Sequence, residues 1–272
     1  MRSEQIKYSL ARGLPIIYEF NNMAIRIFQP TIKEIEEILF NYDSYKFVYS
    51  ATKENLELSD GENIDKYEGL SYFQILFKLK NQIYFHMLLL SLTFFLKVKL
   101  DNIRLYLDEM KIVIVSDEGQ EIFTLDNSNF EEFSEFIRLI CCCEKIKNEE
   151  DKDHLKPTTF YKNKDLQKMY EDSLKQYNDY MDKKKRENSF TLADIISSIS
   201  INEKSKYKFK DIDDLTMWQL YFIYNSMFVR EGNEFTKMQF CSYKFSFDDT
   251  PNFEWNKEIK IKLPESMIEK IN

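Results

Sequence analysis

The chain has 272 residues, of which 43% are hydrophobic and 15% aromatic. This is enough apolar material for a sizeable core, so the composition excludes a wholly disordered chain. Gly and Pro number only 5 each, which disfavours folds built on many tight turns or on glycine-rich phosphate loops. Acidic residues outnumber basic ones by 46 to 38, giving a formal charge of −8. Because a negative protein repels phosphate backbones, a general nucleic-acid binder is disfavoured.

After a polar start, the first forty residues carry a hairpin pattern and a helix-start pattern. Residues 15–20 and 24–28 read as strands, and Asn21-Asn22 between them tolerates the positive φ angles of a tight turn. Thr31 with Glu34 three positions later is a capping box, which predicts a helix that begins at this point. The segment 41–58 is rich in tyrosine, and its pattern favours neither helix nor strand.

The middle of the chain alternates between helical and extended patterns. Helical periodicity predicts a helix from Leu70 to about Val98, and Ser128 is the expected N-cap of a second helix that ends near Lys147. Between them, residues 104–107, 111–115 and 121–124 read as three strands. The apolar run 82–96 has only 15 residues, against the roughly 20 that a bilayer span needs. It therefore predicts a buried core helix, with His86 as a hydrogen-bonded core histidine.

The charged segment Asn148 to Pro157 breaks this pattern and predicts a boundary. We expect an N-terminal domain of hairpins and helices over residues 1–147, a charged linker over 148–160, and a helical C-terminal domain with terminal strands over 161–272. The expected fold class is α+β, mainly helical with small antiparallel β-hairpins, in two lobes.

The second half predicts three helices and a final strand. Residues 162–186 form a polar helix with one narrow apolar stripe, and residues 191–199 form a short amphipathic helix. The most apolar helix, Leu215 to Met227, is expected to begin at Asp213 or Asp214, and acids such as Asp211 suit helix N-termini. Residues 259–263 read as an edge strand that its lysines protect.

A narrow apolar stripe on a polar helix packs on one side only or meets a partner. The aromatic residues around Trp218 follow helical spacing, which is typical of a core, but Trp and Tyr are also the usual anchors of protein interfaces. The candidate partner-binding residues of these two helices are Leu166, Met169, Leu174, Tyr177, Met181, Trp218 and Tyr221.

No catalytic signature stands in the sequence. There are 2 histidines and 4 cysteines, with no nucleophile elbow, dinucleotide fingerprint, P-loop or Cys-x-x-Cys pair. Adjacent cysteines on a helix point about 100° apart, so Cys141, Cys142 and Cys143 are expected to be reduced thiols and not a metal site. The basic run from Lys183 to Arg186 reads as the solvated end of a polar helix. We therefore expect no enzyme activity, no metal and no cofactor.

One loose pattern keeps a nuclease open as a remote alternative. Asp249 precedes Glu258 and Lys260 by about ten positions, which is the order of residues in restriction-like nucleases. Such carboxylates would hold Mg²⁺, and the lysine would stabilise the phosphate in the transition state. A Glu-x-Lys pattern is common in a chain that is 31% charged, so an ordinary amphipathic strand explains it equally well.

Two stretches resemble bacteriophage tail proteins. The opening hairpin followed by QPTIKEIEEI resembles the start of small tail-associated proteins. The later stretches FTLADIISSIS, DIDDLTMWQLYFIYNSM and FEWNKEIKI are similar in layout to tail assembly chaperones. The resemblance covers about half of the chain. It implies a non-enzymatic factor in the host cytoplasm or the virion that binds other tail or virion proteins, or a second copy of itself, and neither membrane nor nucleic acid.

An acidic inhibitor of a host enzyme or defence protein is the main alternative to an assembly factor. Such a protein presents carboxylates where nucleic acid would bind its target. The two hypotheses predict different partners, a virion protein in one case and a host protein in the other.

Overall fold

The computed structural model describes residues 2–56, 67–79, 83–146, 168, 191–202 and 206–240. The chain divides into two compact units, one formed by Met1–Ile146 with Ile196–Asn272 and the other by Lys147–Ile195. The second unit is described only at Lys168 and at residues 191–195, so the account below concerns the first. The predicted linker over 148–160 and the predicted helix over 162–186 fall outside the described ranges, and the predicted domain boundaries stay a prediction.

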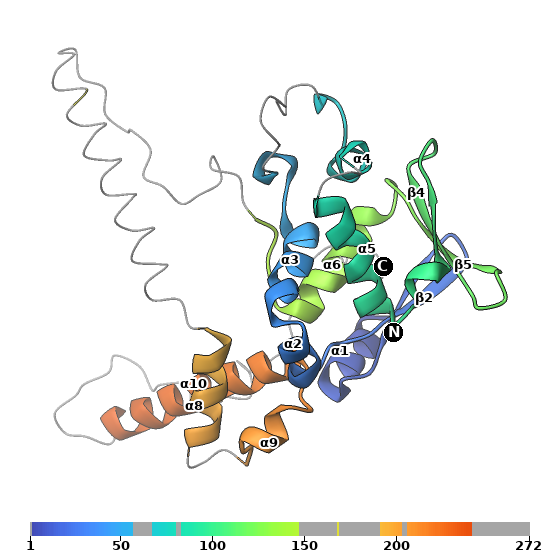
Figure 1. The fold of residues 1–272 in the computed structure, drawn as a ribbon. Helices are drawn as coiled ribbons and strands as arrows, with labels where there is room; N and C mark the ends of the chain where they lie inside the picture. Colours follow the sequence, from blue (N-terminus) through green and yellow to red (C-terminus); the bar gives the residue numbers. More distant parts are fainter. Residues whose placement is uncertain are drawn as a thin grey trace. The chain divides into compact units, whose positions relative to one another are not determined.

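Helices and two small antiparallel sheets make up the described chain, which confirms the predicted α+β class (Figure 1). The elements follow one another as α1 (Arg2–Arg12), β1 (Ile16–Phe20), β2 (Met23–Ile27), α2 (Ile32–Glu37), α3 (Leu39–Ser50), η1 (Lys53–Asn55), α4 (Tyr72–Lys78), α5 (Ile83–Leu96), η3 (Leu100–Asn102), β3 (Ile103–Tyr106), β4 (Lys111–Val115), β5 (Glu121–Leu125), α6 (Phe130–Cys141), α8 (Leu192–Ile201), α9 (Phe209–Ile212) and α10 (Met217–Phe240).

The predicted hairpin and the three predicted strands are confirmed within about one residue. Strands β1 and β2 pair antiparallel with Ile16 opposite Ile27, and Asn21 and Asn22 take φ angles of 47° and 62° in the turn. The second sheet has the order β3-β4-β5, with β4 in the middle and buried along most of its length. Strand β2 also contacts β5, so the two sheets meet on one side of the core.

The ends of the helices confirm one predicted cap and correct another. Thr31 caps α2 through the expected capping box with Glu34. The predicted cap of α6 was wrong, because Asn129 is the N-cap and the side chain of Asp126 accepts the Ser128 N–H at 2.7 Å. Helix α6 also ends at Cys141, before the predicted Lys147, because Cys142 adopts a left-handed conformation with φ 52°.

Other differences arise where the apolar pattern is weak. Neither α1 nor α3 was predicted, because α1 buries only the short pair Ile6 and Leu10 and the core side of α3 is made largely of tyrosines. The predicted long helix over 70–98 is two helices, α4 and α5.

An aromatic core joins α3, α5, α6 and the first hairpin, and Figure 1 shows the three helices beside one another. Tyr18 of β1 packs against Phe133 and Phe136 of α6 with ring centroids 5.7 and 5.3 Å apart. Tyr49 of α3 contacts rings of α5 and α6, and its hydroxyl lies 2.7 Å from Ser91 Oγ. The tyrosines of α3 are therefore core residues with a satisfied polar end.

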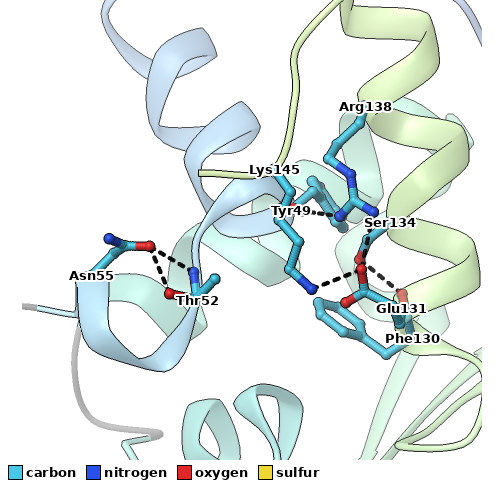
Figure 2. A network of polar contacts seen from close by, with 8 residues as sticks. All are labelled: Tyr49, Thr52, Asn55, Phe130, Glu131, Ser134, Arg138 and Lys145. Atoms are coloured by element: carbon cyan, nitrogen blue, oxygen red, sulfur yellow. Dashed lines mark hydrogen bonds and ion pairs between the residues drawn. The ribbon is translucent and has the colours of Figure 1, made fainter. Parts of the chain in front are cut away.

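A buried arginine fastens α6 to the end of α3 (Figure 2). Arg138 is 8% exposed and donates to the Tyr49 carbonyl oxygen at 2.7 Å and to Glu131 Oε1 at 3.0 Å. Lys145 donates to the same carboxylate oxygen at 3.0 Å. The arginine thus satisfies one of the carbonyl groups that the last turn of a helix leaves unpaired.

Helix α5 is buried on one face only, which corrects the expectation of a wholly buried helix. Phe85, Leu88 and Leu92 lie in the core, whereas His86 is exposed and does not lie among core side chains. Within the described ranges, no helix is long and apolar enough to cross a membrane.

Candidate partner-binding surface

A capping box fixes the start of α10. The Gln219 N–H donates to Thr216 Oγ1 at 3.3 Å, and the Thr216 N–H donates to Gln219 Oε1 at 2.9 Å. The helix therefore begins at Met217, and the predicted start at Asp213 or Asp214 was wrong because a Thr-x-x-Gln pattern can cap a helix as Ser/Thr-x-x-Glu does. Asp211 is instead in the first turn of α9, where its carboxylate accepts the Lys208 N–H at 2.8 Å.

The capped end of α10 is attached to the N-terminal part of the chain. Gln219 donates through Nε2 to the Ala11 carbonyl oxygen at 3.0 Å, and the Ile32 N–H donates to the Leu215 carbonyl oxygen at 2.8 Å. Gly13 has a φ of +66°, and a Cβ added there would lie 3.3 Å from the Thr216 methyl group. The close approach leaves little room at Gly13, so the first turn of α10 has a fixed seat.

The first turns of α10 are buried against that seat. Met217 and Leu220 lie in the core, and Trp218 is 8% exposed with its ring stacked on Phe222 at 5.1 Å. Burial raises the pKa of Tyr221, and the nearby Cys142 thiol raises it further. Tyr221 thus faces the turn that ends α6. Partner binding by Trp218 and Tyr221 stays a prediction.

Beyond Tyr224 the same helix turns its aromatic side chains outward. Tyr224, Phe228, Phe235 and Met238 recur at intervals of four, seven and three residues, which places them on one stripe of a helix. Tyr224 is buried and packs edge-on against Phe228 at 4.8 Å. Phe228 and Phe235 are 53% and 57% exposed, and Met238 is exposed as well. We call these four residues the aromatic face of α10.

A groove runs along the aromatic face beside the end of α8. It has a volume of about 350 Å³, and Ser198, Ile201, Tyr224 and Phe228 are among its lining residues. Asn202 donates through Nδ2 to Glu231 Oε1 at 2.9 Å across one side of it. Ile201 is exposed, so α8 adds another uncovered apolar side chain to this surface.

A second groove lies on the neighbouring side of α10, with a volume of about 310 Å³. Its floor is apolar and its rim carries two cations. We call it the basic groove and define it by Lys206, Tyr207, Phe222, Ile223, Met227 and Arg230.

The other predicted site residues are not brought to this surface by the described chain. Leu166, Met169, Leu174, Tyr177 and Met181 lie outside the described ranges, as do Asp249, Glu258 and Lys260 of the alternative nuclease pattern. In the ranges that are described, no group of three or more His, Cys, Asp or Glu side chains could hold a metal ion.

The three adjacent cysteines are free where they are described, as expected of reduced thiols. Burial raises the pKa of the Cys141 thiol, so this cysteine is protonated at neutral pH and is a poor nucleophile. It serves as packing at the end of α6.

Comparison with known families places this surface in a recognised segment. Residues 183–260 match the family model of the YomV second domain. YomV is a phage-encoded family, so the match supports a phage origin for the chain. No curated protein and no solved structure is significantly similar to it. The matched segment contains α8, α9 and α10, and with them both grooves and the aromatic face.

The sequence reasoning missed the outer half of α10. The predicted helix stopped at Met227, whereas α10 continues to Phe240. The signal was present in the spacing of Phe228, Phe235 and Met238, but the charged residues between them hid the stripe.

Proposed function

We propose that this chain is a non-enzymatic protein-binding factor of phage virion or tail assembly, acting in the host cytoplasm. The observation that carries the proposal is the aromatic face of α10. Phe228, Phe235 and Met238 are large apolar side chains exposed together on a helix, inside a segment that matches a phage-encoded domain. Contiguous exposed apolar side chains are typical of binding surfaces, and aromatic residues supply most interface hot spots.

The form of this surface favours a helical or extended apolar segment as its ligand. The face is a narrow stripe that continues from a buried anchor, Tyr224, and a groove lies along it. Burial of a Phe side chain contributes about 1.5–3 kcal/mol, so two such anchors give a useful affinity without any large rearrangement. The layout resemblance to tail assembly chaperones supports tail or virion proteins as the ligands, since these are kept from aggregating while a tail is built.

Co-expression with the tail and virion proteins of the same gene cluster tests the proposal. We expect one of them to co-purify with the chain and to become more soluble in its presence. Phe228→Ser combined with Phe235→Ser should reduce the recovered partner at least about tenfold, the effect of losing roughly 1.4 kcal/mol of binding. Leu100→Ser is the matched control, because Leu100 is 52% exposed and lies outside the matched segment.

Two outcomes would contradict the proposal. One is that no protein of the cluster co-purifies or gains solubility. The other is that the double variant, with an unchanged circular dichroism spectrum, recovers as much partner as Leu100→Ser does.

A further inference from the structure

The rim of the basic groove carries two cations that no described residue neutralises. Lys206 and Arg230 both line the groove, and neither forms an ion pair or hydrogen bond with another described residue. Between them the floor is formed by the apolar and aromatic side chains of Tyr207, Phe222 and Met227. In a chain with a formal charge of −8, such a groove is complementary to a segment that has both carboxylates and aromatic rings.

The chain itself contains a segment of that chemistry directly after α10. Residues 247–255 read FDDTPNFEW. The adjacent carboxylates Asp248 and Asp249 match two cations, and Phe253 and Trp255 match an apolar floor. Pro251 between the two pairs disfavours a continuous helix through the segment.

The connection is long enough for this segment to reach the groove. Phe240, the last residue of α10, comes ten positions after Arg230, a distance of about 15 Å along a helix axis at 1.5 Å per residue. Asp248 comes eight positions after Phe240, and eight extended residues span up to about 26 Å. The chain can therefore turn back and bring Asp248 and Asp249 beside Arg230.

The domain match gives a separate reason to join the two parts. The matched segment begins before α8 and extends to residue 260, about twenty residues beyond Phe240. The groove and the segment 247–255 therefore belong to one domain of the YomV model, and a domain is held together by its own apolar contacts.

We propose that residues 247–255 dock in the basic groove of the same chain, with Asp248 and Asp249 against Lys206 and Arg230 and with Phe253 and Trp255 on the apolar floor. The docked segment closes this side of α10 and leaves the aromatic face to a partner. The proposal does not depend on which partner that is.

The chain contains only two tryptophans, Trp218 and Trp255, which gives a direct probe. In the full chain with Trp218→Phe, all tryptophan fluorescence comes from Trp255. A docked Trp255 emits at shorter wavelength than a tryptophan in water and is poorly quenched by acrylamide. We expect both properties in this background, with an unchanged circular dichroism spectrum as evidence of folding.

Charge reversal then tests the place of docking. Lys206→Glu with Arg230→Glu should release the segment, shift the Trp255 emission toward that in water and raise the quenching constant several-fold. Adding Asp248→Lys with Asp249→Lys restores opposite charges and should restore protection. Lys210→Glu is the control for a charge change alone, since Lys210 is an exposed cation of α9 outside the groove, and it should leave Trp255 protected.

Three results would overturn the proposal. Trp255 in the Trp218→Phe chain could be as accessible to acrylamide as free tryptophan, which would mean that the segment is not docked. Protection that survives Lys206→Glu with Arg230→Glu would place the segment elsewhere. Release without rescue by the reversed aspartates would exclude the proposed charge pairing.

Discussion

Arg138 is a residue whose position, more than its charge, stabilises the fold. Its guanidinium is buried and donates to the Tyr49 carbonyl oxygen at 2.7 Å, where no other described group satisfies the same need. A buried acceptor that loses its donor costs about 1–3 kcal/mol. We expect Arg138→Ala to lower the free energy of unfolding by that amount, measured by urea denaturation.

Lys145→Ala is the control for this change, because it removes the other cation at Glu131 from a half-exposed position. Exposed ion pairs contribute about 0–1 kcal/mol, so the control should be nearly neutral. Equal losses in the two variants would mean that the ion pair and not the Tyr49 carbonyl carries the effect.

Gly13 and Gly69 separate the cost of a backbone angle from the cost of a close contact. Both have positive φ angles, but an added Cβ at Gly13 meets the Thr216 methyl group at 3.3 Å, whereas at Gly69 nothing lies within 4 Å. The left-handed angle alone costs about 1–2 kcal/mol for alanine. Gly13→Ala should therefore lower the melting temperature more than Gly69→Ala does. The seat of α10 would be less tight than described if the two losses were equal.

Glu34 makes stability depend on pH in a defined direction. Burial alone would raise the pKa of this carboxyl, but hydrogen bonds from Lys97 and from the Thr31 N–H outweigh burial and leave the pKa below its ordinary value of 4.5. A carboxyl with a lower pKa in the folded state stabilises the fold above its unfolded pKa, and this contribution is lost as pH falls through the folded pKa.

Glu34→Gln tests this linkage because glutamine can keep the capping box without the charge. The wild-type chain should melt at a higher temperature than Glu34→Gln at pH 7, and the difference should shrink as the pH is lowered below about 4.5. A difference that is constant from pH 7 to pH 3 would show that the charge makes no contribution.

At the residue scale, the sequence was informative where one local contact decides the geometry. Asn21-Asn22 and the Thr31–Glu34 box were predicted because their function is complete within four residues. The exposure of His86 was not, since it depends on which face of α5 meets α3, a long-range contact that periodicity in an apolar run does not reveal.

At the element scale, α10 is one helix with two environments. Its first turns are buried, and its outer turns carry the aromatic face. Gly232 lies between Phe228 and Phe235, and an added Cβ there meets nothing within 4 Å. Gly232→Ala should therefore stabilise the outer turns by about 0.5–1 kcal/mol. Higher helicity by circular dichroism and a higher melting temperature are the expected results, and a lower melting temperature would contradict them.

The elements that the sequence did not reveal share one physical cause. Helices α1 and α3 have few aliphatic residues on their buried faces, and tertiary contacts stabilise them more than an amphipathic pattern does. The outer part of α10 is the opposite case, because its apolar stripe is present but has no described core behind it. A stripe without a core is the feature that points to a partner.

At the scale of the whole molecule, the evidence joins a phage-related segment to an uncovered aromatic surface. The match to the YomV second domain supports the phage origin, and the exposed residues of α10 lie within it. The predicted partner helix over 162–186 lies outside the described residues, so the aromatic face is the surface on which an assembly role can be tested first.

The most direct test of that role is affinity purification of the tagged full chain from phage-infected cells, with the bound proteins identified by mass spectrometry. The account predicts that a tail or other virion protein is recovered with the wild-type chain and with Leu100→Ser, and is lost with Phe228→Ser combined with Phe235→Ser. Recovery of a single host enzyme in place of any virion protein, or equal recovery by all three chains, would contradict it.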